Sequence, residues 1–397
     1  MRIGTWHQCG HNSQKMIIEL IENGIGSGVI VSSRDVPRHK AIEYSSIYRS
    51  KGCDVIIDLQ FCKPDFSNAK IETYETFDFR QSIARLNAIS DTEIENLKSA
   101  IQSINTDVRT TAILAPAVKY EAGRPDICDL NNKLFEASKT VGDSLSIPTY
   151  ATVIIGNSAT PSMDTINSIL SEATSLNCDG WYLGFEFETH ERVPSSVKGV
   201  YNCCSAQLKL ACTGKPVLFA YAGPLGLLSY GVGATGIGIG HWHNLWQFTR
   251  DRFDEVESGG GSGDAPARYF SRAMWGTIVY PDEVSLLNAE TRSIVHTQSP
   301  FSPSNFQTIQ LWDKWASYKH LLYVIGDTLS QIRKSKTPQA RLRNAKRILE
   351  TAIQTHSKIP FDLKDNTDVY QANWITVIDS LLKNNSSDFD FLDLMSS

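Results

Sequence analysis

Two pairs of polar residues in the sequence have the types and the spacing that acid–base chemistry requires. Asp58 and Gln60 end one short apolar segment, and Glu186 and Glu188 end another. Residues two apart in a strand point to the same face, so each pair presents its side chains together. Of two carboxylates on different strands, one can stay ionised and stabilise positive charge while the other donates a proton. Cleavage of a glycosidic bond needs such a pair, because its transition state resembles an oxocarbenium ion. The sequence leaves open which carboxylate has which role.

Further polar and aromatic side chains belong to other apolar segments. His241 and His243 follow a glycine-rich segment, Arg34 follows residues 28–33, and Trp6 lies in the first segment. Two imidazoles two residues apart could share a metal ion, but no H-E-x-x-H helix accompanies them. Recognition of a substrate by these side chains is therefore favoured over metal binding. The eight cysteines contain no C-x-x-C pair, so neither a metal nor another cofactor is expected.

Eight short apolar segments are predicted strands, and helical patterns lie between most of them. The strand segments are residues 2–8, 28–33, 55–61, 111–117, 151–156, 180–187, 216–222 and 235–240. The helical segments are residues 37–51, 91–104, 127–141, 162–175, 205–212 and 225–231. This alternation indicates a parallel sheet. No Gly-x-Gly-x-x-Gly follows the first strands, so we expect a TIM-type (β/α)8 barrel and not an open dinucleotide-binding sheet.

A barrel of this type gathers its functional groups at the carboxyl ends of the strands, where the polar residues above are placed. From residue 306 onward the pattern is helical, with apolar residues on one face. We therefore expect a barrel domain over residues 1–300 and a C-terminal helical extension over residues 301–397.

The composition is typical of a soluble protein in a reducing compartment. The 397 residues are 41% hydrophobic and 20% charged, and no apolar run approaches the roughly 18 residues that span a bilayer. The first residues have no apolar signal-peptide core, and eight cysteines in so long a chain do not suggest a disulfide scaffold. We expect a cytoplasmic protein without a membrane partner.

A run of basic residues stands out against the net charge of −5. It contains no acid and consists of Arg333, Lys334, Lys336, Arg341, Arg343, Lys346 and Arg347. A solvated helix face and a surface that contacts phosphates both remain open.

Several of these segments resemble the tRNA-guanine transglycosylase superfamily, and in particular its branch that inserts 7-deazaguanine bases into DNA. The resemblance rests on residues 28–35 (GVIVSSRD), 52–61 (GCDVIIDLQF), 180–188 and 224–240. It implies that Asp58 matches the aspartate that acts near the base. It also implies that Gly184 and Phe185 match the pair that lines the base site.

The sequence departs from the family where the covalent aspartate nucleophile would follow the last strand. It reads Gly240-His241-Trp242-His243 there, and the zinc-binding cysteine cluster of the tRNA enzymes is also missing. A retained carboxylate without the nucleophile favours hydrolysis over base exchange. We therefore expect a DNA glycosylase that removes a modified base, as an antiphage defence enzyme would. The aromatic residues that would hold the flipped base are Trp6, Trp181, Phe185 and Trp242, and the basic run would hold the flanking phosphates.

Three other functions remain open. A DNA transglycosylase would need another nucleophile, for which Asp251 and Asp254 are candidates. The missing nucleophile is also compatible with a non-catalytic barrel that binds nucleic acid. A barrel enzyme acting on a small molecule, such as a sugar hydrolase, would leave the basic run merely solvated.

Overall fold

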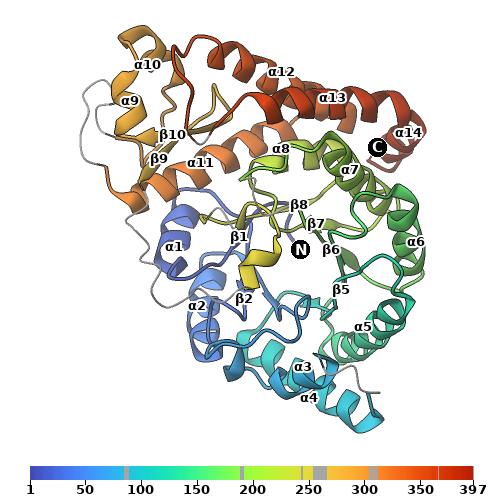
Figure 1. Cartoon of the computed structure of the whole chain (residues 1–397). Helices are drawn as coiled ribbons and strands as arrows, with labels where there is room; N and C mark the ends of the chain where they lie inside the picture. Colours follow the sequence, from blue (N-terminus) through green and yellow to red (C-terminus); the bar gives the residue numbers. More distant parts are fainter. Residues whose placement is uncertain are drawn as a thin grey trace.

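The chain forms a sheet of eight parallel strands that closes nearly into a barrel, with helices on its outside (Figure 1). This computed structural model describes residues 1–84, 89–187, 192–242, 245–253, 266–303, 306, 312–364 and 366–396. The strands are β1 (Gly4–Gln8), β2 (Gly28–Ser32), β3 (Asp54–Asp58), β4 (Ile113–Leu114), β5 (Thr149–Ile155), β6 (Gly180–Phe185), β7 (Val217–Phe219) and β8 (Gly236–Ile239). Each overlaps one of the eight predicted segments, so the (β/α)8 barrel is confirmed.

The strand order β3-β2-β1-β8-β7-β6-β5-β4 places each strand beside its neighbours in sequence and β1 beside β8. The first and last strands of this order, β3 and β4, approach each other at Val55 and Thr111. The Thr111 N–H donates to the Val55 carbonyl oxygen at 2.8 Å, and the Val55 N–H donates to the Thr111 hydroxyl at 3.2 Å. These bonds connect β3 to the residues just before β4 and close the ring.

The barrel interior is filled by side chains, and Trp6 is one of the largest of them. Trp6 is fully buried, and its indole N–H donates to the Arg2 carbonyl oxygen at the amino end of β1. A Cβ atom at Gly28 would lie 2.4 Å from the indole ring, and one at Gly236 would lie 3.1 Å from its nitrogen. Glycine at these positions therefore makes room for the ring. Trp6 packs the barrel, which corrects the prediction that it contacts a substrate.

The helices of the barrel layer overlap the predicted helical segments and include two that were not predicted, α1 and α3. They are α1 (Gln14–Glu22), α2 (Arg38–Ser50), α3 (Phe77–Ala84), α4 (Asp91–Val108), α5 (Pro125–Leu145), α6 (Met163–Thr174), α7 (Val197–Ala211) and α8 (Gly226–Ser229). Short 3-10 turns are η1 (Ile71–Thr73), η2 (Gly223–Leu225), η3 (Tyr230–Val232) and η5 (Arg250–Phe253). In α1 the buried Met16, Ile17 and Leu20 have helical spacing, so the signal for this helix was present in the sequence.

The helix that packs next to β8 is separated from β8 in the sequence by several other elements. An antiparallel hairpin of β9 (Ala267–Ser271) and β10 (Gly276–Tyr280) comes first, then α9 (Asp282–Leu286) and α10 (Ala289–Val295). Only then does α11 (Lys314–Arg333) pack against β1, α1 and α8. It therefore occupies the place of the eighth barrel helix.

Three more helices complete the C-terminal region: α12 (Pro338–His356), α13 (Val369–Asn384) and α14 (Ser386–Ser396). They lie along α7, α8 and α11 (Figure 1), and their apolar side chains belong to the same core as those of the barrel helices. Residues on both sides of position 300 thus share one core, and the domain boundary at 300/301 stays a prediction. Within the described ranges, no helix is both long and apolar enough to cross a membrane.

Candidate functional site

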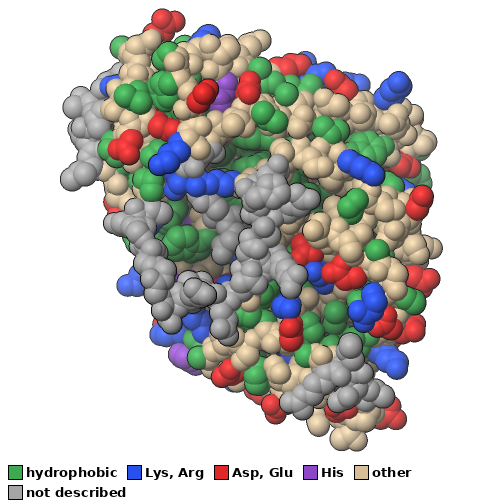
Figure 2. Space-filling view, in the orientation of Figure 1, with side chains coloured by type: hydrophobic (Ala, Val, Ile, Leu, Met, Phe, Trp, Pro, Cys, Tyr) green, Lys and Arg blue, Asp and Glu red, His purple; other side chains and the backbone are tan. Residues whose placement is uncertain are grey.

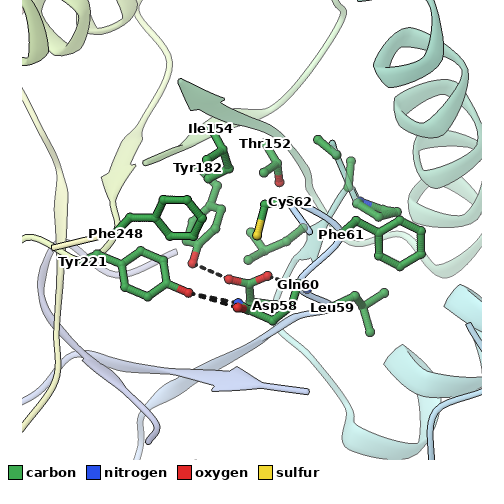
Figure 3. A pocket seen from close by; sticks show the side chains of 14 residues that line it. Asp58, Leu59, Gln60, Phe61, Cys62, Thr152, Ile154, Tyr182, Tyr221 and Phe248 are labelled. Carbon is green, nitrogen blue, oxygen red and sulfur yellow. Dashed lines mark hydrogen bonds between the residues drawn. The ribbon is translucent and has the colours of Figure 1, made fainter. Parts of the chain in front are cut away.

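Asp58, the last residue of β3, lies at the carboxyl end of the barrel, with its carboxylate held by two donors (Figure 3). The Gln60 N–H donates to one oxygen at 2.9 Å, and the Tyr182 hydroxyl donates to the other at 2.8 Å. Phe248 and Cys62 line the same small cavity. Its volume of about 10 Å³ leaves room for about one water molecule. The cavity around Asp58 is therefore too small for a nucleobase as the side chains stand.

The pKa of Asp58 is raised above the usual value of an aspartate. Burial is the main cause, because removal from water disfavours the charged form. The bonds from Gln60 and Tyr182 and the nearby charges of Arg252 and Arg80 lower it in part. A carboxyl group with a raised pKa can act as a proton donor closer to neutral pH than an exposed one.

Gln60 and Tyr221 meet across the barrel mouth in a strained backbone conformation. Both have left-handed φ angles, +57° for Gln60 and +53° for Tyr221, which are uncommon for residues with a side chain. The Gln60 amide donates to the Tyr221 hydroxyl at 3.0 Å, and the Tyr221 N–H donates to the Gln8 side-chain oxygen at 3.2 Å. Such strain persists only where the surroundings enforce it, and it concentrates at functional sites. Gln60 thus lies beside Asp58 through its backbone N–H, and its contact with a substrate stays a prediction.

Arg80 on α3 holds the loop that carries Gln60. Its guanidinium is fully buried and donates to four carbonyl oxygens of this loop. The acceptors are Leu59 at 2.8 Å, Gln60 at 2.9 Å, Lys63 at 2.8 Å and Phe66 at 3.2 Å. One side chain thereby satisfies loop carbonyls that have no strand partner, and it fixes the position of Gln60 beside Asp58.

Glu186 lies beside a second, larger cavity of about 420 Å³. Its carboxylate accepts from the Lys119 ammonium at 2.6 Å and from the Asn157 N–H at 2.8 Å. Lys119 also pairs with Glu121 at 2.8 Å, so one ammonium joins two carboxylates. A cavity of this size lies within the range of small-molecule sites.

For Lys119 and Glu121, burial and charge pairing shift the pKa in opposite directions. Burial lowers the pKa of Lys119, but its hydrogen bonds and charge pairs with Glu121 and Glu186 outweigh that effect and raise it overall. Burial likewise raises the pKa of Glu121, but Lys119 and Ser158 outweigh it, so the net pKa is lowered. Lys119 and Glu121 are therefore both held in their charged forms.

The two cavities are neighbours, because Cys62 and Phe248 line both of them. The Phe248 carbonyl oxygen also accepts from the Phe187 N–H at 3.0 Å, which ties the loop after β8 to the end of β6. Asp58 and Glu186 therefore face adjacent cavities, with the side chains of Cys62 and Phe248 between them.

Other predicted site residues lie elsewhere. Phe185 is 1% exposed and packs with Phe187 in the core between β6 and the surrounding helices, so it does not face either cavity. Gly184 is on the opposite face of β6 from Phe185, and a Cβ there would lie 2.7 Å from the Ile154 side chain. The predicted base contact of Phe185 is therefore corrected. Glu188 and His243 lie outside the described residues, as do the side chains of Asp251 and Asp254.

His241 is buried among aromatic rings and not beside Asp58. Its ring centroid lies 5.0 Å from Trp242, 5.2 Å from Tyr318 and 5.9 Å from Trp315. Burial lowers its pKa to about 3, so the imidazole is neutral at neutral pH. In the part of the chain that the structure describes, it lines neither cavity. Across those same residues, no group of three or more His, Cys, Asp or Glu side chains could hold a metal ion.

The basic run begins at the opposite end of the barrel from Asp58. Arg333 ends α11 and donates to the Ile3 carbonyl oxygen at 2.9 Å, just before β1 begins. Barrel helices run antiparallel to the strands, so the last turn of α11 reaches their amino ends. Arg341 likewise donates to the Ser335 carbonyl oxygen at 3.0 Å, and Lys346 pairs with Asp379 at 2.7 Å. The prediction that this run contacts phosphates beside the pocket is corrected for its first residues.

Several residues of the site were not selected from the sequence. Glu121 follows β4 two residues after Lys119, which the rule of strand ends does select, so the same rule could have included Glu121. Tyr182 has the same parity in β6 as Glu186, which also signals a shared face. Arg80 and Arg252 carried no such signal, because they reach the site from a helix and a loop.

No protein-family model matches this sequence, and a search among curated proteins finds no significant match. The resemblance to the transglycosylase superfamily therefore stays an expectation, and function has to be argued from the site.

Proposed function

We propose that the protein is a DNA glycosylase that hydrolyses the N-glycosidic bond of a modified base. One observation carries this proposal: two carboxylates with different surroundings face adjacent cavities at the barrel mouth. Asp58 has a raised pKa and a cavity for one water, whereas Glu186 is ion-paired beside a cavity of about 420 Å³. Two carboxyl groups with such different surroundings are typical of the acid and the base in an active site.

In the proposed reaction the flipped nucleotide occupies the larger cavity, beside Glu186. Asp58 donates its proton to the leaving base through the water in its own cavity, a relay that general acids use. The bond between the sugar and the base breaks with its electrons going to the base. Glu186 stabilises the sugar cation and orients a second water, whose oxygen adds to the anomeric carbon. The proton released by that water restores Asp58.

DNA as the substrate is supported by the resemblance of residues 28–61 to the DNA-directed branch of the superfamily. A duplex buries its bases, so the enzyme would have to extrude the target nucleotide, which modified or mismatched bases make easier. The proposed biological role is the removal of modified bases from phage DNA.

The test is incubation of the purified protein with modified and unmodified phage DNA, followed by assays for free base and abasic sites. Asp58→Asn and Glu186→Gln should each lower the rate of base release by about 10²–10⁴-fold, the usual contribution of a general acid or base. Asp54→Asn, at the other end of β3, is the matched control and should keep its activity. Near-normal rates in both site variants, with the fold intact by circular dichroism, would overturn the assignment.

A second candidate is a hydrolase that acts on a free nucleoside or another small glycoside. The position of Arg333 and Arg341 at the amino end of the barrel favours it, because these cations do not border the cavities. Figure 2 shows acidic and basic side chains interspersed on the visible face. Release of base from free nucleosides, with no release from any DNA, would select this candidate.

A further inference from the structure

The barrel mouth carries a cation cluster of its own, formed by Arg34, Lys70 and Arg252 around Asp35. Arg34 pairs with one oxygen of Asp35 at 2.6 Å, and Arg252 pairs with the other at 2.7 Å. Arg34 and Asp35 follow β2, and Arg252 lies in η5 after β8. These positions are at the same carboxyl end of the barrel as Asp58.

Positive charge exceeds negative charge within the cluster. Asp35 is its only carboxylate among the described residues, and it lies between two guanidinium groups. Arg252 is 1% exposed. Its charge also acts on the Asp58 carboxyl, where it partly offsets the rise in pKa that burial causes. The buried Nε atoms of both Arg34 and Arg252 have no hydrogen-bond partner. Buried cations without a full set of partners are costly, so an anionic ligand would stabilise this arrangement.

Lys70 extends the cluster toward solvent. Its ammonium lies 2.9 Å from the Nδ1 atom of His11, which follows β1. Burial lowers the pKa of Lys70, and the charge of Arg34 lowers it further, whereas Asp35 raises it only in part. Burial also lowers the pKa of His11, as does the charge of Lys70. Arg34 and Lys70 thus have lowered pKa values, whereas burial of Arg252 is outweighed by Tyr221, Asp35 and Asp58, which raise its pKa.

Arg252 links this cluster to the proposed reaction site. Its guanidinium lies 5.1 Å from the centre of the Tyr221 ring, and Tyr221 accepts the hydrogen bond from Gln60 beside Asp58. Arg34 is held over the Phe66 ring at 5.5 Å. Both guanidinium groups are thus fixed in place, which suits the planar, two-pronged recognition of phosphate oxygens.

We propose that Arg34 and Lys70, backed by the buried Arg252, bind a phosphate group of the substrate, next to the sugar whose glycosidic bond is broken. This inference rests on the proposed function, because it assigns a nucleotide phosphate to the same site. The phosphate would come either from the DNA backbone or from a free nucleotide.

The experiment measures binding, not base release, so that it is independent of the proposed chemistry. Affinity for a short labelled DNA duplex is measured from about 50 to 200 mM salt for wild type, Lys70→Met and the control Lys40→Met. Lys40 is also partly exposed, but it lies on α2 and pairs with Glu43. Loss of one phosphate contact should weaken binding about tenfold at low salt and make the slope of log affinity against log salt shallower by about 1. Lys40→Met should match wild type.

A second arm uses a nucleoside 5′-monophosphate and the corresponding nucleoside. If the monophosphate binds tighter than the nucleoside, and Lys70→Met removes the difference, the phosphate site stands even when duplex binding does not depend on Lys70. In that case the free nucleotide is the source of the phosphate. The proposal is overturned if Lys70→Met matches Lys40→Met in both arms. Base release by wild type would still be judged separately.

Discussion

Replacing Lys119 by methionine gives a direct test of how the larger cavity is built. The change keeps the aliphatic stem of the side chain but removes the ammonium that joins Glu186 and Glu121. Glu186 is only 4% exposed and would retain one donor, the Asn157 N–H. Breaking a buried ion pair from one side costs about 3–5 kcal/mol, because the remaining charge is left uncompensated. Since 20% of the Lys119 side chain is exposed, we expect the lower end of this range, about 3 kcal/mol.

The double variant Lys119→Met/Glu186→Gln separates charge from packing. A neutral glutamine can still accept from Asn157 through its carbonyl oxygen, so no buried charge remains unpaired. We expect the double variant to lose only about 1 kcal/mol, about 2 kcal/mol less than Lys119→Met alone, and Glu186→Gln alone completes the mutant cycle that yields the coupling energy. Pairing Lys119→Met with Glu121→Gln should give a coupling below about 1 kcal/mol, because Glu121 is more exposed.

The assay is urea unfolding of each variant, followed by tryptophan fluorescence. The midpoint should shift while the slope of the unfolding free energy against urea stays constant, as expected when only stability changes. If the double variant is as unstable as Lys119→Met alone, the lysine contributes through packing, and the argument from an uncompensated Glu186 carboxylate fails.

Two further predictions concern pH and the loop beside Asp58. Burial lowers the pKa values of His7 to about 4 and of His241 and His320 to about 3, so below pH 6.5 the unfolded chain binds protons that the folded chain does not. The free energy of unfolding should therefore fall as the pH drops from 6.5 toward 4, with a slope of up to about 4 kcal/mol per pH unit for three protons. Asp58, whose pKa is raised, opposes this by at most one proton. His320→Gln should reduce the slope measured by urea titrations at several pH values, and an unchanged slope would contradict the assignment. Arg80→Lys should cost about 3 kcal/mol or more and slow base release, since one ammonium cannot serve four carbonyl oxygens; a urea midpoint within error of wild type would refute this.

The strands were predictable because each is a short apolar run bounded by polar residues and turns. Helices between the runs then required a parallel sheet, and eight runs matched a closed barrel. The rule that strand ends carry function also led from the sequence to Asp58, Gln60 and Glu186. These inferences use only local patterns, which a single sequence contains.

Other parts of the site depend on which side of a strand faces inward and on distant contacts. Both faces of a barrel strand are buried and apolar, so composition could not show that Phe185 faces the helices while Tyr182 faces the interior. The pair of Asp35 and Arg252 joins residues 217 positions apart, which no spacing rule reveals. The place of Arg333 at the amino end of the barrel could not be predicted for a related reason, because it follows from the direction of α11.

The late position of α11 in the sequence also affects how the protein is made. The strand β8 ends at Ile239, but the helix that covers it and β1 begins only at Lys314. At about 5–20 residues per second, a ribosome needs roughly 4–15 s to synthesise the segment between them. Until then the apolar surface that α11 buries with Val324, Ile325 and Leu329 has no cover on the nascent chain. We therefore expect resistance to aggregation during synthesis to depend on the arrival of this helix as well as on the completion of the eight strands.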